Sequence, residues 1–587
     1  MAASVIPAKL AFLGETPYSD AFGDVYHSAA GGPAQAEHVF LKGNGLPQRW
    51  ARRERFVILE TGFGFGLNFL VTLAAWRRNP GEKLHYVAVE KHPFTLQDLR
   101  TLHARYPALK EEAAQLHSQW PLLLSGGHRA ELEQGRVVLT LFFADIKILR
   151  DLRLAADAVY LDGFSPAKNP DMWTSQVMRS VSRLAAPEAT LATWSVATQV
   201  RASLERTGFE VEKRAGFGHK KEMLVGRNTR RENAVQKRER KAVVVGAGLA
   251  GAAVCERLCA RGWEVELIER RAGPAQEASG NPAGAFHPVV TPDDSVFARL
   301  TRAGFLQSLN RWRALEDLRW DQCGLLQLAR DEREAASQLK AVDGLPQEYA
   351  QVVSREEATA HAGVAVAAGG VWFPEAGWID PKSLVDAQLA ACGSRLHRKF
   401  NTELKELPMD RIVILANSFD APKLHPVPHL RLRRVRGQLT YMPADQFEPP
   451  RVVVLRGGMV LPPVDDICVV GASFDIDDDD PAPRVTSHAG NLERLARIVP
   501  FASVLKDLQG RVAFRAVTPD RLPVVGALGE NVHGAFAYGS RGLVWAALAA
   551  ELIASQLEGD PLPLEGKLVD ALAPARFRIR AGGKKND

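Results

Sequence analysis

The sequence predicts an α/β protein with two nucleotide-binding units in tandem. In both halves of the 587-residue chain, short apolar segments alternate with helical patterns, which is typical of parallel sheets covered by helices. Two glycine-rich turns, at 61–66 and 246–251, each follow an apolar strand and open a helix. We therefore expect a Rossmann-like unit with a mostly parallel sheet, then a second Rossmann-type unit that carries an inserted antiparallel α+β domain.

In the first half, apolar runs predict strands and amphipathic runs predict helices. We expect strands at 55–60, 85–90, 137–143, 157–162 and 189–195, helices at 67–78, 95–105 and 197–207, and a closing hairpin from 209–213 and 222–225.

The second half begins with the same alternation and then becomes more mixed. We expect a strand at 241–246, a helix at 249–261, and strands at 264–269 and 411–417. The segments 451–464 and 467–474 indicate antiparallel strands of a separate sheet.

A basic segment divides the two halves. Seven of the fifteen residues at 227–241 are Lys or Arg, and none is aromatic. A solvated connector and a basic strap that touches nucleic acid both fit this composition, and we favour the connector. The predicted domains are 1–228, a linker 229–241, and 242–587. Within the last domain we expect a cofactor-binding part at 242–295, 375–428 and 515–575, and a substrate-binding part at 296–374 and 429–514.

Composition excludes several protein classes. A hydrophobic content of 46% and a charged content of 24% exclude wholesale disorder. The five cysteines include no CxxC pair, so we expect neither a disulfide scaffold nor a metal site. The N-terminus has no signal-peptide pattern, and the longest uncharged apolar stretch, 242–255, is too short to span a membrane. We therefore expect a soluble cytoplasmic protein, and its net charge of +6 permits a polyanionic partner.

The first glycine-rich turn predicts a binding site for S-adenosylmethionine. Gly62, Gly64 and Gly66 allow a sharp turn before a helix N-terminus, and Glu90 ends the next strand, where it can accept ribose hydroxyls. The spacing alone also fits a dinucleotide site or a structural turn. Because no basic residue near the turn is placed to meet a pyrophosphate, we favour a cofactor without phosphate. Glu60, Asn68 and Asp145 complete the predicted cofactor contacts.

A second carboxylate lies at the end of a strand in the same half. Asp162 precedes an aromatic residue and a proline, in the segment DGFSPAKNPDMW. A carboxylate in this place can hold an amine nucleophile beside the methyl donor, because ligands of such sheets bind at the carboxyl ends of strands. A helix cap or an Asx-turn is the structural alternative. Lys168 lies beside the proposed site and is a candidate for substrate contact.

Four segments of this half resemble a known family. Residues 24–44, 60–70, 161–173 and 214–226 are similar to the methyltransferase half of the bifunctional tRNA 5-methylaminomethyl-2-thiouridine biosynthesis proteins, MnmC. The resemblance covers most of 10–226.

The second glycine-rich turn predicts a dinucleotide site. Gly246, Gly248 and Gly251 lie between a strand and a helix, and Glu269 ends the next strand. This pattern does not distinguish FAD from NAD. The small-residue loop 277–288 favours the larger cofactor, as does a helix start that can stabilise a reduced flavin. The predicted contacts in these two segments are Ser279, Gly280, Asn281, Gly539, Ser540, Arg541 and Gly542.

Resemblance supports FAD in this half. The segments 370–381 and 514–526 resemble the D-amino-acid oxidase and glycine oxidase superfamily, and 279–288, 433–441 and 539–546 resemble the oxidoreductase half of MnmC. The order of the two halves is also that of MnmC.

The resemblance implies a two-step modification of a wobble uridine in the anticodon loop of tRNA. The flavin half would remove the carboxymethyl group from 5-carboxymethylaminomethyl-(2-thio)uridine. The other half would then methylate the resulting amine, and Asp162 would either accept the excess proton or orient the lone pair of the amine. Arg515 lies where the glycine-oxidase-like pattern carries its carboxylate-binding arginine, and Arg436 and Tyr538 are further substrate candidates. A surface or structural salt bridge is the alternative role for Arg515.

Two other functions fit part of the pattern. An amino-acid oxidase fused to a small-molecule amine methyltransferase would need the same cofactor motifs. A tRNA-binding protein with inactive cofactor folds would not need the intact glycine turns and carboxylates. The basic turn 219–221 could contact phosphates or remain solvated. We expect no obligate protein partner.

Overall fold

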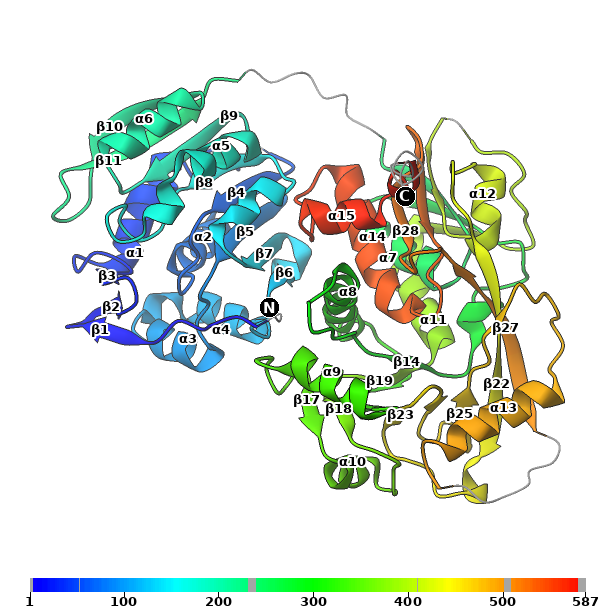
Figure 1. Cartoon of the computed structure of the whole chain (residues 1–587). Coiled ribbons are helices and arrows are strands. Elements are labelled where there is room, and N and C mark those ends of the chain that lie inside the picture. The colour runs from blue at the N-terminus through cyan, green and yellow to red at the C-terminus, as the bar shows by residue number, and fades with distance from the viewer. Residues whose placement is uncertain (1–3, 52, 231–238, 409, 501–507, 579–587) are drawn as a thin grey trace, which may run out of the picture. The chain divides into compact units, whose positions relative to one another are not determined.

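The computed structural model describes residues 4–51, 53–230, 239–408, 410–500 and 508–578, and the chain forms two compact units (Figure 1). The N-terminal unit consists of Ser4–Gln236 and Glu558–Lys567. The C-terminal unit consists mainly of Lys237–Leu557 and Leu568–Asp587. Residues 231–238 of the predicted linker lie outside the described residues, and the domain boundaries remain predictions.

The N-terminal unit is built on an eight-stranded sheet in the order β10-β11-β9-β8-β4-β5-β7-β6. The central pairs are parallel, whereas β6, β10 and β11 pair antiparallel with their neighbours. This confirms the predicted mostly parallel sheet. Its strands are β4 (Phe56–Glu60), β5 (Leu84–Glu90), β6 (Gly126–Leu132), β7 (Val137–Phe143), β8 (Ala156–Tyr160), β9 (Ala185–Thr193), β10 (Phe209–Ala215) and β11 (Glu222–Asn228).

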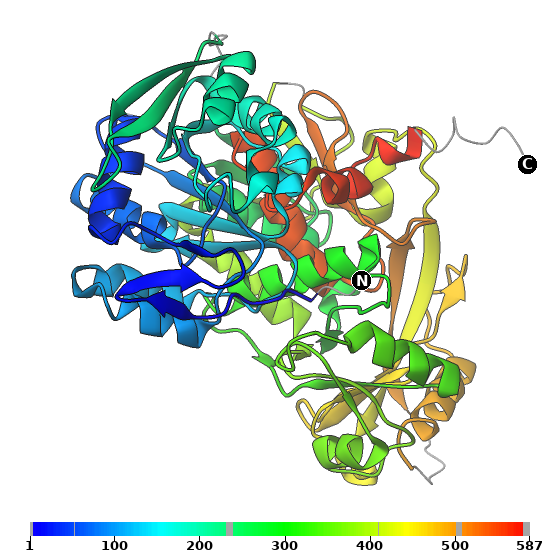
Figure 2. The same cartoon turned by 60° about the vertical axis from the view of Figure 1, so that its left-hand side comes forward.

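Helices cover both faces of this sheet, as Figures 1 and 2 show. One apolar core lies under α2 (Leu67–Arg78), α3 (Leu96–His103) and α4 (Lys110–Ser118). A second core lies under α5 (Ser175–Leu184) and α6 (Thr198–Arg206). Because both faces are buried, the central strands are continuous apolar runs, which is why the sequence predicted them.

The segment Glu558–Lys567 packs on the edge of this sheet, although it follows α14 (Gly542–Glu558) near the end of the chain. Arg129 Nη2 donates to Pro561 O at 2.5 Å, and Leu562 N donates to Arg153 O at 3.2 Å. A Cβ atom on Gly127 would lie 2.5 Å from Pro563 O, so glycine is needed for this close approach.

Asp560 in this segment is buried among basic groups. Its side chain is 2% exposed, and its carboxylate lies 3.2 Å from His85 Nε2, 3.7 Å from Arg55 Nη1 and 3.9 Å from Lys83 Nζ. We predict that Asp560→Ala will destabilise the N-terminal unit by about 3 kcal/mol, because it removes a buried carboxylate that faces the buried His85 ring and the partly exposed Arg55 and Lys83 side chains. Thermal unfolding would measure this effect. The transition of the N-terminal unit is recognised as the one that S-adenosylmethionine moves to higher temperature. Glu82→Gln changes an exposed carboxylate nearby and should leave that transition in place.

The C-terminal unit contains a six-stranded sheet in the order β20-β13-β12-β21-β29-β28. All pairs are parallel except β28 with β29. The strands are β12 (Lys241–Val245), β13 (Glu264–Ile268), β20 (Leu396–Lys399), β21 (Ile412–Leu415), β28 (Val524–Ala527) and β29 (Val532–Phe536), and α7 (Leu249–Cys259) follows β12 directly.

A second, largely antiparallel sheet in this unit has the order β17-β18-β16-β23-β24-β25-β22-β26, with β27 paired to β22. This confirms the predicted inserted domain, although β16 and β23 are parallel. The strands are β16 (Leu325–Leu328), β17 (Gln351–Val353), β18 (Gly370–Phe373), β22 (Arg433–Pro443), β23 (Val453–Leu455), β24 (Met459–Val460), β25 (Ile467–Gly471), β26 (Asp475–Ile476) and β27 (Gln509–Val517).

Smaller elements complete the two units. A third sheet of the C-terminal unit contains β14 (Gly284–Phe286), β15 (Trp320–Asp321) and β19 (Gly377–Ile379), and the N-terminal unit has a small sheet of β1 (Ala11–Leu13), β2 (Thr16–Ser19) and β3 (Asp24–Val25). The remaining longer helices are α8 (Val296–Trp312), α9 (Glu332–Val342), α10 (Arg355–Ala362), α11 (Pro381–Ala391) and α13 (Val485–Ala496).

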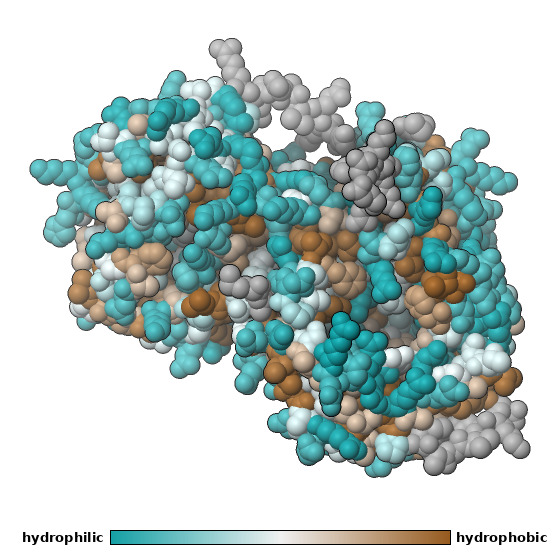
Figure 3. Space-filling view, in the orientation of Figure 1, coloured by the Kyte–Doolittle hydropathy of each residue, from teal (hydrophilic) through white to brown (hydrophobic). Residues whose placement is uncertain are grey.

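Polar residues dominate the face of the molecule in Figure 3, with apolar residues in scattered patches. Within the described ranges, no helix combines the length and the apolar character that a membrane crossing requires.

Candidate active sites

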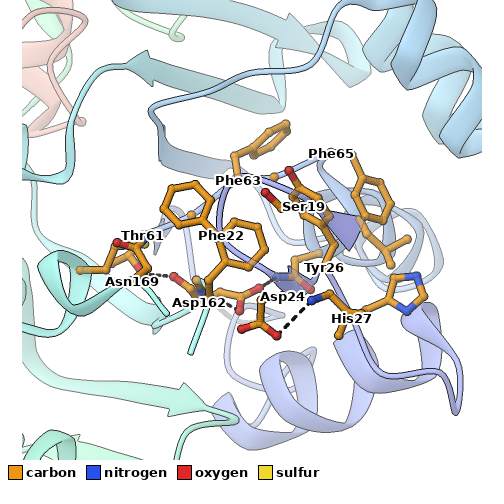
Figure 4. Close-up of a pocket in the computed structure, with 18 of the residues that line it drawn as sticks. Ser19, Phe22, Asp24, Tyr26, His27, Thr61, Phe63, Phe65, Asp162 and Asn169 are labelled. Carbon is orange, nitrogen blue, oxygen red and sulfur yellow. Dashed lines mark hydrogen bonds between the residues drawn. The ribbon is translucent and has the colours of Figure 1, made fainter. Parts of the chain in front are cut away.

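A cavity of about 860 Å³ opens at the carboxyl ends of the central strands of the N-terminal unit. The glycine-rich turn after β4 lines it, together with the residues that follow β5, β7 and β8. In Figure 4, Asp24 and Asp162 point into the same part of the cavity, next to the rings of Phe22 and Tyr26. The cavity therefore combines carboxylates with aromatic walls.

The glycine-rich turn has the backbone that its sequence predicted. Gly64 and Gly66 have φ of +56° and +81°, and a Cβ atom on Gly66 would lie 2.7 Å from the Phe63 ring. Helix α2 begins after Gly66 without a side-chain cap, so its N-terminal N–H groups are available to a ligand. Glu90 Oε2 accepts from Gly64 N at 2.7 Å, which ties the strand-end carboxylate to the turn.

Asn68 joins two carboxylates at the floor of this cavity. Its Nδ2 donates to Glu60 Oε1 at 2.7 Å and to Asp162 Oδ2 at 2.8 Å. Tyr86 OH donates to Glu60 Oε2 at 2.8 Å, and Trp194 Nε1 donates to Asp162 Oδ1 at 3.1 Å. These bonds hold the Asp162 carboxylate in a fixed orientation.

Burial shifts the acidity of both carboxyl groups. It raises the pKa of Asp162 to about 6, although hydrogen bonds from Gly163 N, Asn68 and Trp194 oppose the shift. The pKa of Glu60 is also raised well above its usual range, by burial first and by the charge of Asp162 second. Asp162 is therefore ionised at neutral pH yet basic enough to accept a proton. Its Oδ1 also accepts from Gly163 N at 2.8 Å, and because this bond is to the next residue it is neither the helix cap nor the Asx-turn that was the structural alternative.

The structure adds residues that sequence reasoning missed. Asp24 Oδ2 accepts from Ser165 N at 2.9 Å, and Phe22 stacks on Phe164 with ring centroids 4.8 Å apart. Trp194, from the loop after β9, was also unassigned. Asp24 lies in a segment that carried the family resemblance, which was the one available signal.

Two predicted residues lie at the margin of the cavity. Asp145 lines it, and its carboxylate also accepts from Lys147 N at 3.1 Å and pairs with Lys91 Nζ at 3.0 Å. Lys168 is exposed, and its Nζ would lie 3.6 Å from a Cβ atom on Gly23. The position of Asp145 on the cavity wall is compatible with its predicted contact to the cofactor. The exposed position of Lys168 gives less support to its predicted contact with the substrate.

The second glycine-rich turn lies between β12 and α7. Gly246 has φ of +103°, and a Cβ atom on Gly251 would lie 1.8 Å from Gly246 O. Helix α7 starts after Gly248 without a side-chain cap. Glu269, just beyond β13, accepts from Ala247 N at 2.9 Å through Oε2. This arrangement fits the pyrophosphate and ribose of a dinucleotide.

The loop 277–288 folds against this turn. Ser279 Oγ accepts from Leu249 N at 3.0 Å, and Arg511 Nη2 donates to Glu277 O at 2.7 Å. Asn281 Oδ1 and Tyr538 OH are buried polar atoms without a hydrogen-bond partner among the described residues. Together with the glycine cradle, these two atoms fit a large polar cofactor such as FAD.

Gly251→Ala should abolish flavin binding, because the added methyl group cannot fit against Gly246 O. We expect the purified variant to be colourless by visible absorption and to retain methyl transfer. Gly490→Ala is the matched control, because a Cβ atom there meets only the end of the Arg494 side chain, at 3.4 Å. A yellow Gly251→Ala protein would contradict the assignment of this turn.

Arg515, on β27, lies across Gly437 of the neighbouring strand β22. A Cβ atom on Gly437 would lie 2.3 Å from Arg515 Nη2, so glycine makes room for the guanidinium. Arg515 Nη1 donates to Ser473 O at 3.2 Å, and its Cζ lies 5.9 Å from the Phe474 ring, which is 53% exposed. Burial lowers the pKa of Arg515, while Asp475 opposes this shift. A partly desolvated guanidinium with donors to spare suits a carboxylate.

Arg541, just before α14, is the second arginine of this region. Its Nη1 donates to His287 O at 3.4 Å, and burial lowers its pKa to about 10. Neighbouring Gly539 has φ of +57°, which gives the turn before the helix its shape. Ser540 is exposed, and Gly542 is the first residue of α14.

Arg436 is in a different environment from the one the sequence suggested. Its side chain is 0% exposed, and all its donor nitrogens are bonded to protein oxygens. These acceptors are Asp480 O, Asp475 Oδ2, Ser487 Oγ, Gln438 Oε1 and Ala482 O. The geometry argues against a substrate contact and favours a structural role, because the donors of Arg436 are already bonded and its neighbours Gln438 and Thr440 on β22 are buried as well.

The fold and the two sites define a methyltransferase joined to an FAD-dependent oxidoreductase. Residues 107–229 match the model of an S-adenosyl-L-methionine-dependent methyltransferase family, and residues 241–556 match that of the FAD dependent oxidoreductase family. The chain is therefore an enzyme, with S-adenosylmethionine and FAD as its cofactors.

Whole-chain relatives identify the family. The chain is 47% identical to the tRNA 5-methylaminomethyl-2-thiouridine biosynthesis bifunctional protein MnmC of Paraburkholderia phytofirmans, and 46% identical to those of Paraburkholderia phymatum and an Azoarcus species. Each match covers 98% of both chains. This chain belongs to the MnmC family. Among solved structures, glycine oxidase from Geobacillus kaustophilus matches 57% of this chain and 98% of its own, at 19% identity and a TM-score of 0.49.

Proposed function

We propose that this chain modifies a wobble uridine of tRNA in two successive steps. The substrate is 5-carboxymethylaminomethyl-(2-thio)uridine, and the product is 5-methylaminomethyl-(2-thio)uridine. The observation that carries this proposal is that one chain combines a partly desolvated arginine, Arg515, in the unit with the FAD-type turn and a buried carboxylate, Asp162, in the methyltransferase cavity. The first site would release the amine that the second site accepts. The relatives' name, which specifies tRNA, supports the same substrate.

The first step removes the carboxymethyl group. The turn 246–251 and the loop 277–288 would hold FAD, which would accept the two electrons removed from a secondary amine. Arg515 binds the substrate carboxylate and so directs the oxidation to the carbon between the carboxylate and the nitrogen. The substrate loses two electrons and two protons, water adds to the carbon–nitrogen double bond, and a two-carbon aldehyde acid leaves. The nucleoside retains a primary amine.

The second step methylates this amine. A nitrogen–carbon bond forms, the bond between sulfur and the methyl group breaks, and S-adenosylhomocysteine leaves. The amine can attack only in its neutral form, so a proton must be lost. Asp162 accepts this proton, and Asn68 and Trp194 hold its carboxylate in place.

Methyl transfer should lose activity as the pH falls through about 6, because protonated Asp162 cannot accept a proton. The burial of Asp162 raises its pKa, so this loss begins at a higher pH than for an exposed aspartate. Single-turnover rates between pH 5 and 9 would measure it. A rate that stays constant down to pH 4.5 would contradict the role of Asp162 as the base.

The direct test is to incubate the holoenzyme with tRNA that carries 5-carboxymethylaminomethyluridine, with and without S-adenosylmethionine. The nucleosides are then separated and weighed by mass spectrometry. We expect aminomethyluridine without the methyl donor and methylaminomethyluridine with it. Oxidation of sarcosine or glycine at rates equal to those on tRNA would favour the small-molecule alternative.

A location in the cytoplasm, where tRNA is modified, is part of the proposal.

A further inference from the structure

The side chain of Lys220 ends on the face of Trp194 in the methyltransferase cavity. Lys220 lies in the loop between β10 and β11, and its Nζ is 3.3 Å from the centroid of the Trp194 ring. Both residues line the cavity. This is a cation–π contact, which holds an ammonium group in place. The basic turn 219–221 thus directs one of its cations into the cavity.

Trp194 connects this cation with the proposed base. The Trp194 ring, which contacts the Lys220 ammonium with its face, donates a hydrogen bond from Nε1 to Asp162 Oδ1. Desolvation beside the Trp194 ring lowers the pKa of Lys220, although the residue as a whole is exposed, and the charges of Asp24 and Asp162 oppose this shift. In return, the charge of Lys220 is one of the influences that lower the pKa of Asp162. His219 and Glu222, on either side of this loop, and Asp171 are further titratable residues that line the cavity.

We propose that Lys220 is a positioning residue for methyl transfer, whose fixed positive charge favours the neutral form of the acceptor amine. This inference rests on the proposed function. A cation close to the amine disfavours its ammonium form, and the same cation favours ionised Asp162. Both effects increase the population of the reactive protonation state, in which a neutral amine lies beside an ionised carboxylate. A neighbouring cationic group activates amine nucleophiles by this principle.

The alternative role for Lys220 is a contact with an RNA phosphate. A phosphate contact would contribute to tRNA affinity and would weaken with added salt. It would not alter the acidity of the amine in the bound complex. The pH dependence of the bound complex therefore separates the two roles, whereas the affinity for tRNA alone does not.

The test measures single-turnover methylation of tRNA that carries 5-aminomethyluridine, with saturating enzyme and S-adenosylmethionine, from pH 5.5 to 9.5. Saturation makes the profile report groups in the complex. We expect Lys220→Met to move the acid limb to higher pH by roughly half to one unit. Its rate at pH 6.5 should fall several-fold, and it should approach the wild-type rate above pH 9. Lys220→Arg, which keeps the positive charge, should restore the acid side of the pH–rate profile to its wild-type position.

Lys221→Met is the matched control, because Lys221 is the next residue on the same turn and is not among the residues that line the cavity. The acid side of its pH–rate profile should coincide with that of the wild type. Binding of S-adenosylmethionine by calorimetry should be equal in all variants, which excludes misfolding as the cause. An unchanged limb in Lys220→Met, with or without weaker tRNA binding, would overturn the inference. If the wild-type enzyme itself fails to methylate this tRNA, the proposed function fails instead.

Discussion

Replacing Asp162 with asparagine should slow methyl transfer by roughly 10²- to 10³-fold, because asparagine keeps the shape and cannot accept a proton. The Asp162 carboxylate is bonded to Asn68 and Trp194, and asparagine can keep one of these bonds. We therefore expect a loss of rate rather than a loss of fold. Single-turnover methylation of aminomethyluridine in tRNA measures the effect, and calorimetry with S-adenosylmethionine should give an affinity within a few-fold of wild type.

The same preparation contains its own control. The oxidation step depends on the other unit, so Asp162→Asn should convert the carboxymethylaminomethyl nucleoside to the aminomethyl nucleoside at the wild-type rate. The variant should therefore accumulate the aminomethyl intermediate in the presence of the methyl donor. Full methylation at pH 7.5 would show that another group, or water, takes the proton.

The sequence predicted the cofactor folds well because their determinants are local. A glycine turn such as 246–251 requires its residues by backbone geometry, and the strands around it are buried on both faces, which makes them apolar throughout. The same is true of β7, whose limits the apolar run 137–143 predicted without error. Such features need no knowledge of distant residues.

The parts that the sequence did not predict depend on contacts between distant segments. Asp24 reaches the cavity because β3 returns beside the loop after β8, and Asp560 is buried against His85, which lies far earlier in the chain. Strand β22 was missed as a strand because its inward side chains are polar, among them Arg436. Hydrophobic periodicity cannot detect a buried strand whose interior is a hydrogen-bond network.

Arg515→Met should lower kcat/KM for oxidation of the carboxymethylaminomethyl nucleoside by roughly 10²- to 10³-fold, because a carboxylate loses its charged partner in a partly desolvated site. Flavin absorption should stay intact, since the contacts of Arg515 are with Ser473 and Phe474 and not with the turn 246–251. Anaerobic flavin bleaching with modified tRNA measures the oxidation directly. Arg515→Lys should recover only part of the rate, because lysine is a point charge without the paired donors.

Two other arginines test the assignment of Arg515 as the residue that binds the substrate carboxylate. One is a control, and the other is the alternative candidate for this role. Arg433→Met removes an exposed guanidinium of β22, whose partner is Asp477, and should leave oxidation unchanged. Arg541 is the second arginine of the region, and its place before α14 suits the flavin rather than the substrate. Arg541→Met should therefore change the flavin spectrum or its reduction potential more than the KM. If Arg541→Met instead raises the KM and Arg515→Met leaves it unchanged, the carboxylate belongs to Arg541, and the roles of the two arginines are exchanged.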